Sequence, residues 1–287
     1  MTETKKQGSL IGIDLGGTKV AAGLVRNGKV VRRKKESIDP EAKTAGETVE
    51  VIAGLLSALA EDDLRGIGIG IPGLVDRERG IAYDVHHVPH WNEVHVRKEL
   101  ETRFPVEIRV DNDANCFAMG EYRYGAWAGT RDFVGATLGT GMGSGIIKDG
   151  ALLSDAHSCS GEFGLIPYLD GVTEDYSGGC FFTRTYGKSG EDLAAEAIRG
   201  ETEALRAFAE YGTHLGWAIR AIMVAVDPAL VILGGSIAGS FDLFRESMWK
   251  TIRDLPFPHV LKDFRVEASR TPDIALLGAA ALCTPSV

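Results

Sequence analysis

Two glycine-rich segments of this chain carry nearly the same pattern of residues at an offset of 123 positions. Residues 11–18 read IGIDLGGT and residues 134–141 read VGATLGTG, so glycine and leucine recur in matching places. Each segment starts as a short apolar strand and continues into a turn of small residues, which is typical of a β-hairpin. The repeated pattern favours a fold built from two similar halves, while a chance likeness of two hairpins is the simpler alternative.

Glycine is unusually common, whereas the rest of the composition is ordinary. The 36 glycines among 287 residues amount to about 13%, against about 7% in an average protein. The length suggests one large domain or two ordinary ones, with ample material for a core. The net charge of −9 argues against a nucleic-acid partner, whose phosphates need a basic surface. Backbone N–H groups can still hold small anions without any side-chain charge.

We expect a cytoplasmic protein with no membrane partner. The longest apolar run, Ile274–Cys283, is about half of the roughly 20 residues that a membrane span requires. The polar residues at the start do not resemble a signal peptide. The four cysteines include no C-x-x-C pair, which indicates reduced thiols rather than a disulfide framework.

Short apolar strands alternate with helices along the chain, a pattern typical of the α/β class. The periodicity predicts strands at 10–14, 19–25, 66–71, 106–110, 133–147 (as a hairpin) and 229–233. It predicts helices at 48–60, 113–124, 204–226 and 273–283. The segment 154–189 is rich in Gly, Ser, Asp and Tyr, and we expect it to be irregular and functional.

The first glycine turn, DLGGTK at residues 14–19, has the composition of a phosphate site. Its glycines let backbone N–H groups approach a phosphate, and Asp14 at the strand end can hold Mg²⁺ or its waters. A plain hairpin turn with a solvated Asp14 is the alternative. The second cluster, LGTGMGSG at 138–145, favours the phosphate site, because so many small residues make a poor core strand.

A third glycine pattern, Gly68-x-Gly70-x-x-Gly73, matches the dinucleotide fingerprint only in spacing. Pro72 lies inside it, and the following VDRERG at 75–80 reads as a turn instead of a helix. The chain also has no G-x-x-x-x-G-K-[ST] motif, so neither a Rossmann nucleotide site nor a P-loop is expected.

The segment DNDAN at 111–115 follows a predicted strand and opens a predicted helix. Asp and Asn favour helix N-caps, but one cap needs only one such residue and four crowd together here. A carboxylate that takes a hydroxyl proton, beside an amide that orients the hydroxyl group, is the functional interpretation. In phosphoryl transfer, little more is required of the protein beyond positioning and charge neutralisation.

These motifs together resemble the ROK family, the repressor and sugar-kinase group of the hexokinase–actin-like ATPases. The resemblance spans nearly the whole chain and follows the family's motif order through Leu10–Val25, Gly66–Val75, Val110–Glu121, Val134–Ile147, Ser160–Gly164, Val231–Gly235 and Leu276–Ala281. It implies two α/β domains of ribonuclease-H-like fold that flank a cleft holding ATP and sugar. The implied N-terminal domain covers 1–118 plus 272–287, because the last helix returns to it, and the larger C-terminal domain covers 119–271. A homodimer is the family-level expectation.

The resemblance also assigns roles to single residues of this chain. Asp113 corresponds to the catalytic base, and Asp14 to a residue that positions Mg²⁺ indirectly. The sugar-contacting positions fall on Gly73, Asn92, Asn112, Asp113 and Glu162, of which Asn92 aligns only loosely. The ATP-binding positions fall on Gly16, Gly17, Thr18 and Lys19, on Gly139, Thr140 and Gly141, and on Gly234 and Gly235 near the adenosine.

The chain departs from the family where the family holds a structural zinc. The motif G-E-x-G-H ends here in Leu165, and the following cysteine segment keeps only Cys180, with Phe182 in place of its terminal glutamate. One thiolate cannot make a four-ligand site, so we expect no zinc, although a rescue set of His157, Cys159, Asp175 and Cys180 is conceivable. His86, His87, His90 and His95 also crowd one region, but their spacing shows no convergence on a metal.

The same changes alter the expected sugar site. Leu165 and Phe182 would leave an apolar wall there, so the preferred sugar can differ from glucose. Tyr168, Tyr176, Phe181 and Phe182 would either stack on a sugar or replace the zinc as a small hydrophobic core.

Two functions follow from these observations. The first is an ATP- and Mg²⁺-dependent kinase that phosphorylates a hexose hydroxyl, by default the 6-hydroxyl of a glucose-like sugar. The alternative is a non-catalytic sugar-sensing regulator of the same family, acting without DNA binding because only nine residues precede Leu10. The retained Asp14 and Asp113 favour the kinase, since a sensor needs neither a base nor a metal.

Overall fold

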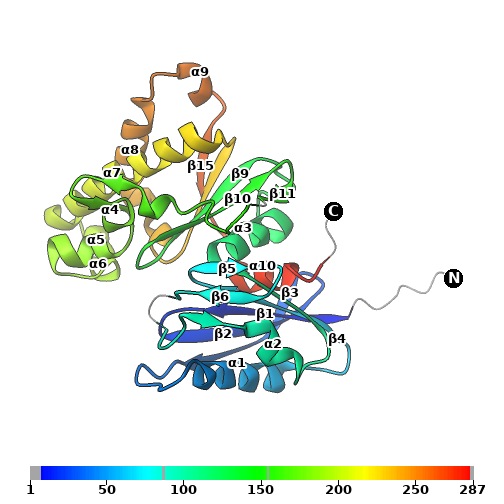
Figure 1. Ribbon diagram of the computed structural model, residues 1–287. Helices are drawn as coiled ribbons and strands as arrows, with labels where there is room; N and C mark the ends of the chain where they lie inside the picture. The colour runs from blue at the N-terminus through cyan, green and yellow to red at the C-terminus, as the bar shows by residue number, and fades with distance from the viewer. Residues whose placement is uncertain (1–7, 86–87, 154, 285–287) are drawn as a thin grey trace. The chain divides into compact units, whose positions relative to one another are not determined.

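The protein divides into two compact units in a computed structural model that describes residues 8–85, 88–153 and 155–284 (Figure 1). Unit 1 comprises Met1–Thr130, Gly150–Ser160 and Arg270–Val287, and unit 2 comprises Arg131–Asp149 and Gly161–Ser269. Helices and strands are mixed in both units, so the predicted α/β class is confirmed.

The central sheet of unit 1 has the strand order β3-β2-β1-β4-β8. In chain order, its strands are β1 (Ser9–Leu15), β2 (Lys19–Arg26), β3 (Lys29–Ser37), β4 (Leu64–Ile71) and β8 (Glu107–Asn112). β1, β2 and β3 pair antiparallel, whereas β4 pairs parallel with both β1 and β8. The carboxyl ends of β1, β4 and β8 therefore meet at one edge of the sheet.

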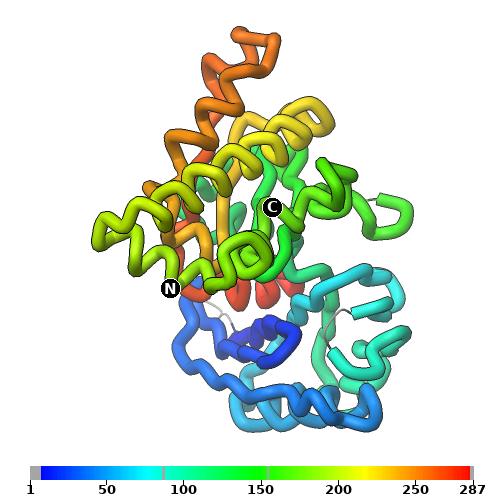
Figure 2. The backbone as a smooth tube through the Cα atoms, turned by 90° about the vertical axis from the view of Figure 1, so that its left-hand side faces the viewer, coloured from blue at the N-terminus to red at the C-terminus, as the bar shows by residue number. Residues whose placement is uncertain are grey.

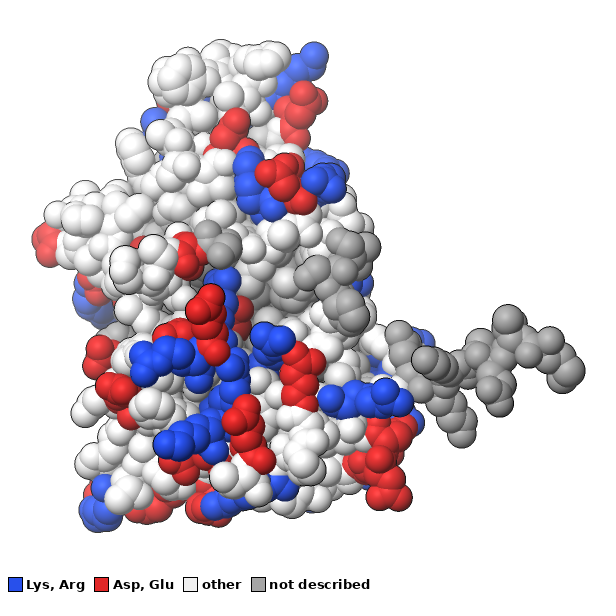
Figure 3. All heavy atoms as spheres, turned by 45° about the vertical axis from the view of Figure 1, so that its right-hand side comes forward, with Lys and Arg blue, Asp and Glu red and all other residues white. Residues whose placement is uncertain are grey.

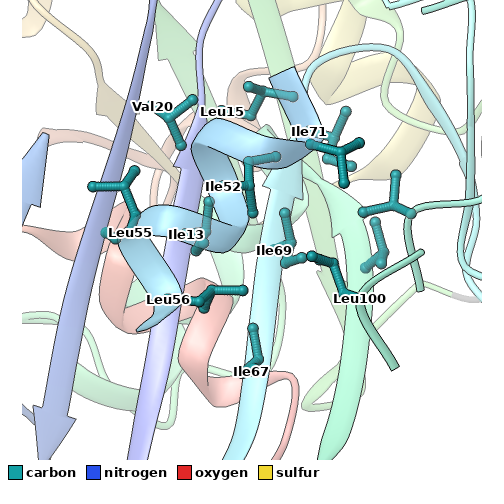
Figure 4. Close-up of a cluster of buried hydrophobic side chains, with 14 of the residues drawn as sticks. Ile13, Leu15, Val20, Ile52, Leu55, Leu56, Ile67, Ile69, Ile71 and Leu100 are labelled. Carbon is teal, nitrogen blue, oxygen red and sulfur yellow. The ribbon is translucent and has the colours of Figure 1, made fainter. Parts of the chain in front are cut away.

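One face of this sheet is apolar because isoleucine alternates with glycine along β4, and two isoleucines alternate in the same way along β1. The isoleucines of this face are fully buried: Ile11, Ile13, Ile67, Ile69 and Ile71. Helix α1 (Ala45–Leu59) covers them with its own apolar stripe, which Figure 4 shows as Ile52, Leu55 and Leu56. Burying one such side chain contributes about 1.5–3 kcal/mol. Because many of them belong to one buried cluster, this layer is the main core of unit 1.

Glycine occupies the opposite face of the same strands, where helix α10 (Ile274–Ala281) crosses them. A Cβ atom at Gly12 would overlap the carbonyl oxygen of Leu276, and one at Gly68 would overlap that of Ala279. Both views of the chain show the red helix α10 against the blue strands β1 and β2 (Figures 1 and 2). The backbone of the last helix thus lies directly on the backbones of the N-terminal strands.

Helix α3 (Asp113–Tyr124) lies beside α10 with an equally close approach. A Cβ atom at Gly278 of α10 would overlap the carbonyl oxygen of Cys116, and one at Gly120 of α3 would overlap that of Ile274. The two helices can lie this close only because both carry glycine at their crossing.

The remaining elements of unit 1 are short. A three-stranded sheet of order β5-β6-β7 contains β5 (Leu74–Asp76), β6 (Ile81–Tyr83) and β7 (Glu93–Val94). It is followed by helix α2 (Val96–Glu101). As predicted, a turn and no helix follows β5 at residues 77–80.

The second five-stranded sheet has the order β11-β10-β9-β14-β15. Its strands are β9 (Phe133–Leu138), β10 (Met142–Lys148), β11 (Ala151–Leu152), β14 (Leu230–Gly234) and β15 (Arg265–Ala268). The longer helices of unit 2 are α6 (Gly190–Ile198), α7 (Thr202–Val226) and α8 (Phe241–Arg253). Shorter elements are η1 (Phe163–Leu165), β12 (Pro167–Tyr168), β13 (Gly171–Val172), α4 (Glu174–Ser177), α5 (Cys180–Tyr186), η2 (Ile237–Ser240) and α9 (Pro258–Leu261).

The two five-stranded sheets repeat one topology, as the repeated sequence pattern predicted. In each, the first strand of an antiparallel hairpin pairs parallel with a later strand, and that strand pairs parallel with another. The orders β2-β1-β4-β8 and β10-β9-β14-β15 therefore correspond strand for strand. The likeness of the two glycine-rich hairpins reflects a duplicated architecture and not chance.

The expectation of an irregular segment at 154–189 is only partly correct. This segment contains the short helices η1, α4 and α5, and α5 alone spans seven residues. These helices were not predicted because each is too short to show a periodic apolar stripe, and glycines lie between them.

On the face drawn in Figure 3, Lys and Arg are interspersed with Asp and Glu. Pairs such as Arg26 with Glu61 and Asp63 keep the two signs together. Within the described part of the chain, no helix combines the length and the apolar character needed to cross a membrane.

The close contact between β4 and α10 gives a direct stability test. We expect Gly68→Ala to lower the free energy of unfolding by about 1–3 kcal/mol or more, because the new methyl group meets backbone that cannot rotate away. Gly54→Ala in α1 is the matched control, since a Cβ atom there meets no atom within 4 Å. It should stabilise the protein by up to about 1 kcal/mol through helix propensity. Urea unfolding midpoints measure both, and equal midpoints would contradict the packing.

Candidate active site

The segment DNDAN forms the corner between β8 and α3, as predicted. Asn112 is the N-cap of α3, and its side-chain oxygen accepts hydrogen bonds from the backbone N–H groups of Ala114 (2.8 Å) and Asn115 (3.2 Å). Its Nδ2 atom donates to the carbonyl oxygen of Gly73 at 3.0 Å. This leaves one amide hydrogen of Asn112 for a ligand. The corner brings together three predicted sugar-site residues, Gly73, Asn112 and Asp113.

Asp113 opens helix α3 at this corner. Its carboxylate accepts a hydrogen bond from the N–H of Ala114 at 2.9 Å, and the residue is half-buried. The first turn of a helix favours the ionised form of a carboxylate, because backbone N–H groups point toward it. A partly accessible carboxylate in this position can accept a proton from a bound hydroxyl group.

Asp14 lies on the same edge of the sheet. It pairs in register with Gly70 of β4, and Gly70 pairs with Asp111 of β8, so the two aspartates occupy one row across three strands. Burial raises the pKa of Asp14, while the charges of Lys35 and Arg33 on β3 oppose the shift.

The buried thiol of Cys116 lies close to three aspartate side chains of this site. Its pKa lies well above the usual range, because it is buried and also faces the carboxylates of Asp111, Asp113 and Asp14. The predicted base Asp113 and the predicted magnesium-positioning residue Asp14 therefore both lie near this buried thiol.

The predicted phosphate turn follows Asp14 directly. The N–H of Gly16 donates to the carbonyl oxygen of Lys19 at 2.9 Å, which closes the turn between β1 and β2. Thr18 and Lys19 are exposed at its tip. The arrangement leaves a hydroxyl group and an ammonium group free to approach a phosphate.

Asn92 lies in the segment between β6 and β7. Its side chain is exposed, and its carbonyl oxygen accepts a hydrogen bond from the N–H of Asp84 at 3.0 Å. Gly73 adopts a φ of 102° and packs against the carbonyl oxygens of Tyr83 and Asp84. Backbone contacts at Asp84 thus connect the Asn92 segment to the Gly73 turn.

In unit 2, the predicted second phosphate loop joins β9 to β10. The carbonyl oxygen of Gly139 accepts from the N–H of Gly179 (2.8 Å), and that of Thr140 accepts from the N–H of Cys180 (3.0 Å). The loop is therefore supported by the very segment in which the family carries zinc ligands. The sequence could not signal this support, because backbone atoms make both hydrogen bonds.

The Gly234-Gly235 turn lies at the end of β14 and beside the second loop. Gly234 pairs with Thr137 of β9, and Gly235 has a φ of 82° with its Cα against the backbone of Leu138. The two predicted nucleotide-binding turns of unit 2 therefore occupy one edge of its sheet.

Glu162 is the residue that precedes the short helix η1. The hydroxyl group of Ser144 donates to the carbonyl oxygen of the adjacent Gly161 at 2.5 Å, which ties this segment to β10. Leu165, in place of the family's histidine, is 55% exposed. It is therefore available to contact a ligand.

Phe182 is buried, whereas Leu165 is exposed. Only one of the two residues predicted to form an apolar wall is therefore accessible to a ligand. Phe181 and Phe182 are buried, and Phe182 packs against Phe208 and Tyr211 with ring centroids about 5 Å apart (4.9 and 5.0 Å). The hydroxyl group of Tyr211 donates to the carbonyl oxygen of Ser177 at 2.7 Å. These rings form a small hydrophobic core where the zinc segment stood, and they cannot stack on a sugar.

Tyr168 and Tyr176 belong to the rim of the same cluster. They pack edge to face, and the hydroxyl group of Tyr168 lies 3.0 Å from Nδ1 of His214. Burial lowers the pKa of His214, with Arg184 adding to the shift and Glu210 opposing it.

The donor set does not fit the family's zinc. Burial, with the charges of Asp175 and Glu174, raises the pKa of Cys180, so this cysteine stays a thiol at neutral pH. Across residues 8–85, 88–153 and 155–284, no three His, Cys, Asp or Glu side chains are grouped to hold a metal ion. His86 and His87 lie outside the described residues, and His95 pairs with Glu93 at 3.1 Å.

Because Phe182 is buried and Leu165 is exposed, we expect their replacement by alanine to affect stability and sugar binding differently. Phe182→Ala should cost about 3–5 kcal/mol of unfolding free energy, because it empties a packed site. Leu165→Ala should change stability by less than about 0.5 kcal/mol and should change the KM for the sugar. Thermal unfolding and sugar kinetics of the two variants check this. A stable Phe182→Ala protein with altered sugar preference would return Phe182 to the ligand site.

The burial of Asp14 predicts a pH-dependent stability. Because folding raises the pKa of this carboxyl above its ordinary value of 3.8, its ionisation at pH 7 opposes folding. Asp14→Asn should therefore stabilise the protein at pH 7, and the gain should vanish as the pH falls below about 3.8. The exposed Asp62→Asn is the control. Urea unfolding at several pH values measures the effect, and a pH-independent gain would contradict it.

Comparisons with known proteins identify the family of this chain. The chain is 29% identical to the glucokinase of Thermotoga maritima, over 95% of this chain and 96% of that protein. It is also 29% identical to the N-acetyl-D-glucosamine kinase of Vibrio cholerae, over 84% and 88%. A crystal structure of a ROK family glucokinase from Streptomyces griseus, in complex with glucose and AMPPNP, matches with a TM-score of 0.85. That match has 28% identity and covers 96% of this chain and 99% of that one. The model of the ROK family matches residues 10–285, and the chain therefore belongs to the ROK family.

Proposed function

We propose that this protein is an ATP-dependent sugar kinase that transfers the γ-phosphoryl group of ATP to the 6-hydroxyl group of a hexose. The observation that carries the proposal is the corner formed by Asn112 and Asp113, on the same sheet edge as Asp14. The similarity to glucokinases and to N-acetyl-D-glucosamine kinases supports the substrate class.

In this proposal, Asp113 is the general base. Its carboxylate takes the proton of the sugar hydroxyl group as the hydroxyl oxygen attacks the γ-phosphorus. The bond from that phosphorus to the oxygen bridging the β- and γ-phosphates then breaks, and ADP leaves. Because the transition state spreads charge over the phosphoryl oxygens, the remaining residues serve to position the groups and to stabilise charge.

Sugar positioning is assigned to side chains around the corner. The free amide hydrogen of Asn112 and the exposed side chain of Asn92 are available to sugar hydroxyl groups. Gly73 is held in place by Asn112, and the family resemblance assigns Glu162, which precedes η1, to the sugar as well. The exposed Leu165 adds an apolar contact, which favours a sugar with an apolar or substituted edge over one bound only by hydrogen bonds.

The phosphates are assigned to backbone N–H groups. Gly16, Gly17 and Thr18 offer them from unit 1, with Lys19 as a cation, and Gly139, Thr140 and Gly141 offer them from unit 2. Gly234 and Gly235 are placed near the adenosine. A Cβ atom at Gly139 would meet no atom within 4 Å, so this backbone is open to a ligand. Such groups suit a chain whose net charge is −9.

Asp14 fits a role toward Mg²⁺, because a carboxylate at a strand end beside a phosphate turn is the hard oxygen donor that this ion prefers. When bound, Mg²⁺ would neutralise charge on the β- and γ-phosphates. The protein's contribution is a fixed carboxylate, held in the sheet by its pairing with Ala21 and Gly70.

A coupled assay of ADP release tests the proposal. Wild type is supplied with ATP and Mg²⁺ and with glucose, mannose, N-acetylglucosamine or N-acetylmannosamine in turn. At least one sugar should stimulate ADP release. Asp113→Asn should reduce kcat by about 100- to 10,000-fold, because the base is lost while the shape of the corner is kept. Circular dichroism verifies that the variant is folded.

Two outcomes would overturn the kinase proposal. One is wild type that releases no ADP with any sugar, and the other is an Asp113→Asn variant as fast as wild type. If calorimetry then shows sugar binding without turnover, the protein is a sugar-sensing regulator instead.

A further inference from the structure

Arg77 lies in the turn between β5 and β6 and reaches the corner that carries Asp113. Its Nε atom donates to Oδ1 of Asp111 at 3.0 Å, and its Nη1 atom donates to the carbonyl oxygen of Leu153 at 3.0 Å. The side chain of Asp111 is 4% exposed and that of Arg77 is 27% exposed. The ion pair is therefore mostly withdrawn from water.

A single oxygen of Asp111 connects the corner to this arginine. Oδ1 also accepts from the backbone N–H of Asn112 (2.7 Å) and from Nδ2 of Asn115 (2.9 Å). One of these donors belongs to the last residue of β8 and the other to the first turn of α3. Asp111 thus fixes the direction in which the chain leaves the strand and enters the helix at Asp113.

The turn that carries Arg77 is itself held in place. Arg97 of α2 donates to the carbonyl oxygens of Arg77 (2.7 Å) and Glu78 (2.6 Å), and to that of Ile108 in β8 (3.0 Å). Arg77 therefore approaches Asp111 from a rigid support rather than from a mobile loop.

Charge explains why an arginine is needed at this position. The charges of Asp111, Asp113 and Asp14 all act on the buried thiol of Cys116, and Arg77 also lies near Asp155. Burial raises the pKa of Asp111, and Arg77 opposes the shift together with hydrogen bonds from Asn115 and Asn112. A buried carboxylate without its cation would be strongly unfavourable in such acidic surroundings.

We propose that Arg77 is a positioning residue for phosphoryl transfer: by pairing with Asp111 and fixing its carboxylate, it sets the placement of Asn112 and Asp113 against the sugar. The proposal rests on the proposed kinase function. It was not visible in the sequence, where residues 75–80 read only as a turn.

The test compares four variants with wild type. Arg77→Met should lower kcat about 10- to 100-fold, because small displacements of a catalytic base are costly, and should leave the KM for ATP nearly unchanged. The acid limb of its pH–rate profile should move to higher pH, since the pKa of Asp111 rises further without the guanidinium. Arg77→Lys restores the charge and should return the acid limb, with an intermediate kcat. Arg79→Met is the matched control, because Arg79 is 62% exposed and 3.8 Å from Asp76.

The double variant Arg77→Met/Asp111→Asn tests whether the loss of activity in Arg77→Met acts through Asp111. Its neutral amide still accepts from the N–H of Asn112 and needs no cation, so it should recover at least threefold in kcat over Arg77→Met and return the acid limb. No recovery, or an Arg77→Met enzyme equal to Arg79→Met in kcat and acid limb, would overturn the proposal while leaving the kinase function in place.

Hydrogen exchange decides the inference if wild type proves inactive. Backbone amides of residues 112–116 should exchange faster in Arg77→Met than in wild type or Arg79→Met, since the corner loses its support. Equal exchange in the three proteins would overturn the role of Arg77, whereas inactive wild type alone would overturn only the kinase proposal.

Discussion

The direct contact of helix α10 with the backbones of β1, β4 and α3 is the constraint on which the rest of unit 1 depends. At Gly12, Gly68 and Gly278 a single added methyl group would overlap a carbonyl oxygen. The sheet can therefore bury isoleucine under α1 on one face and accept a helix without intervening side chains on the other. Some of the glycines of this chain serve such contacts, and others lie in the turns proposed to bind phosphate.

This layering places the site. With β1, β4 and β8 parallel and in register, Asp14 and Asp111 must share one edge of the sheet, and α3 begins at that edge with Asp113. Unit 2 repeats the topology but supports its loop differently. There, the backbone of Gly179 and Cys180 holds Gly139 and Thr140, and a cluster of aromatic rings underlies these residues. The loop is thus held by backbone hydrogen bonds from a segment that packs through its aromatic rings.

Sequence patterns predicted what depends on local periodicity and missed what depends on long-range contact. The helix at 113–124 and both glycine-rich hairpins are found where expected, because their signals lie within a few residues. Strand β3 was not predicted, since as an edge strand it consists largely of charged residues and shows no apolar alternation. Phe182 looked like a ligand contact because only its neighbours in space, Phe208 and Tyr211, reveal that it is core. Arg77 was missed for the same reason, as its partners Asp111 and Leu153 are 34 and 76 residues away.

The position of α10 along the chain has a consequence for biosynthesis. Strands β1 and β4 and helix α1 leave the ribosome early, so the isoleucine layer can assemble at once. The glycine face of the same strands must wait for Ile274–Ala281, about 200 residues after the end of β4. At about 5–20 residues per second, that interval is roughly 10–40 s. All of Arg131–Ser269 that belongs to unit 2 emerges during this time. Unit 2 can therefore complete its fold while the nascent unit 1 still exposes an uncovered sheet face, and it is this face that chaperones would have to protect.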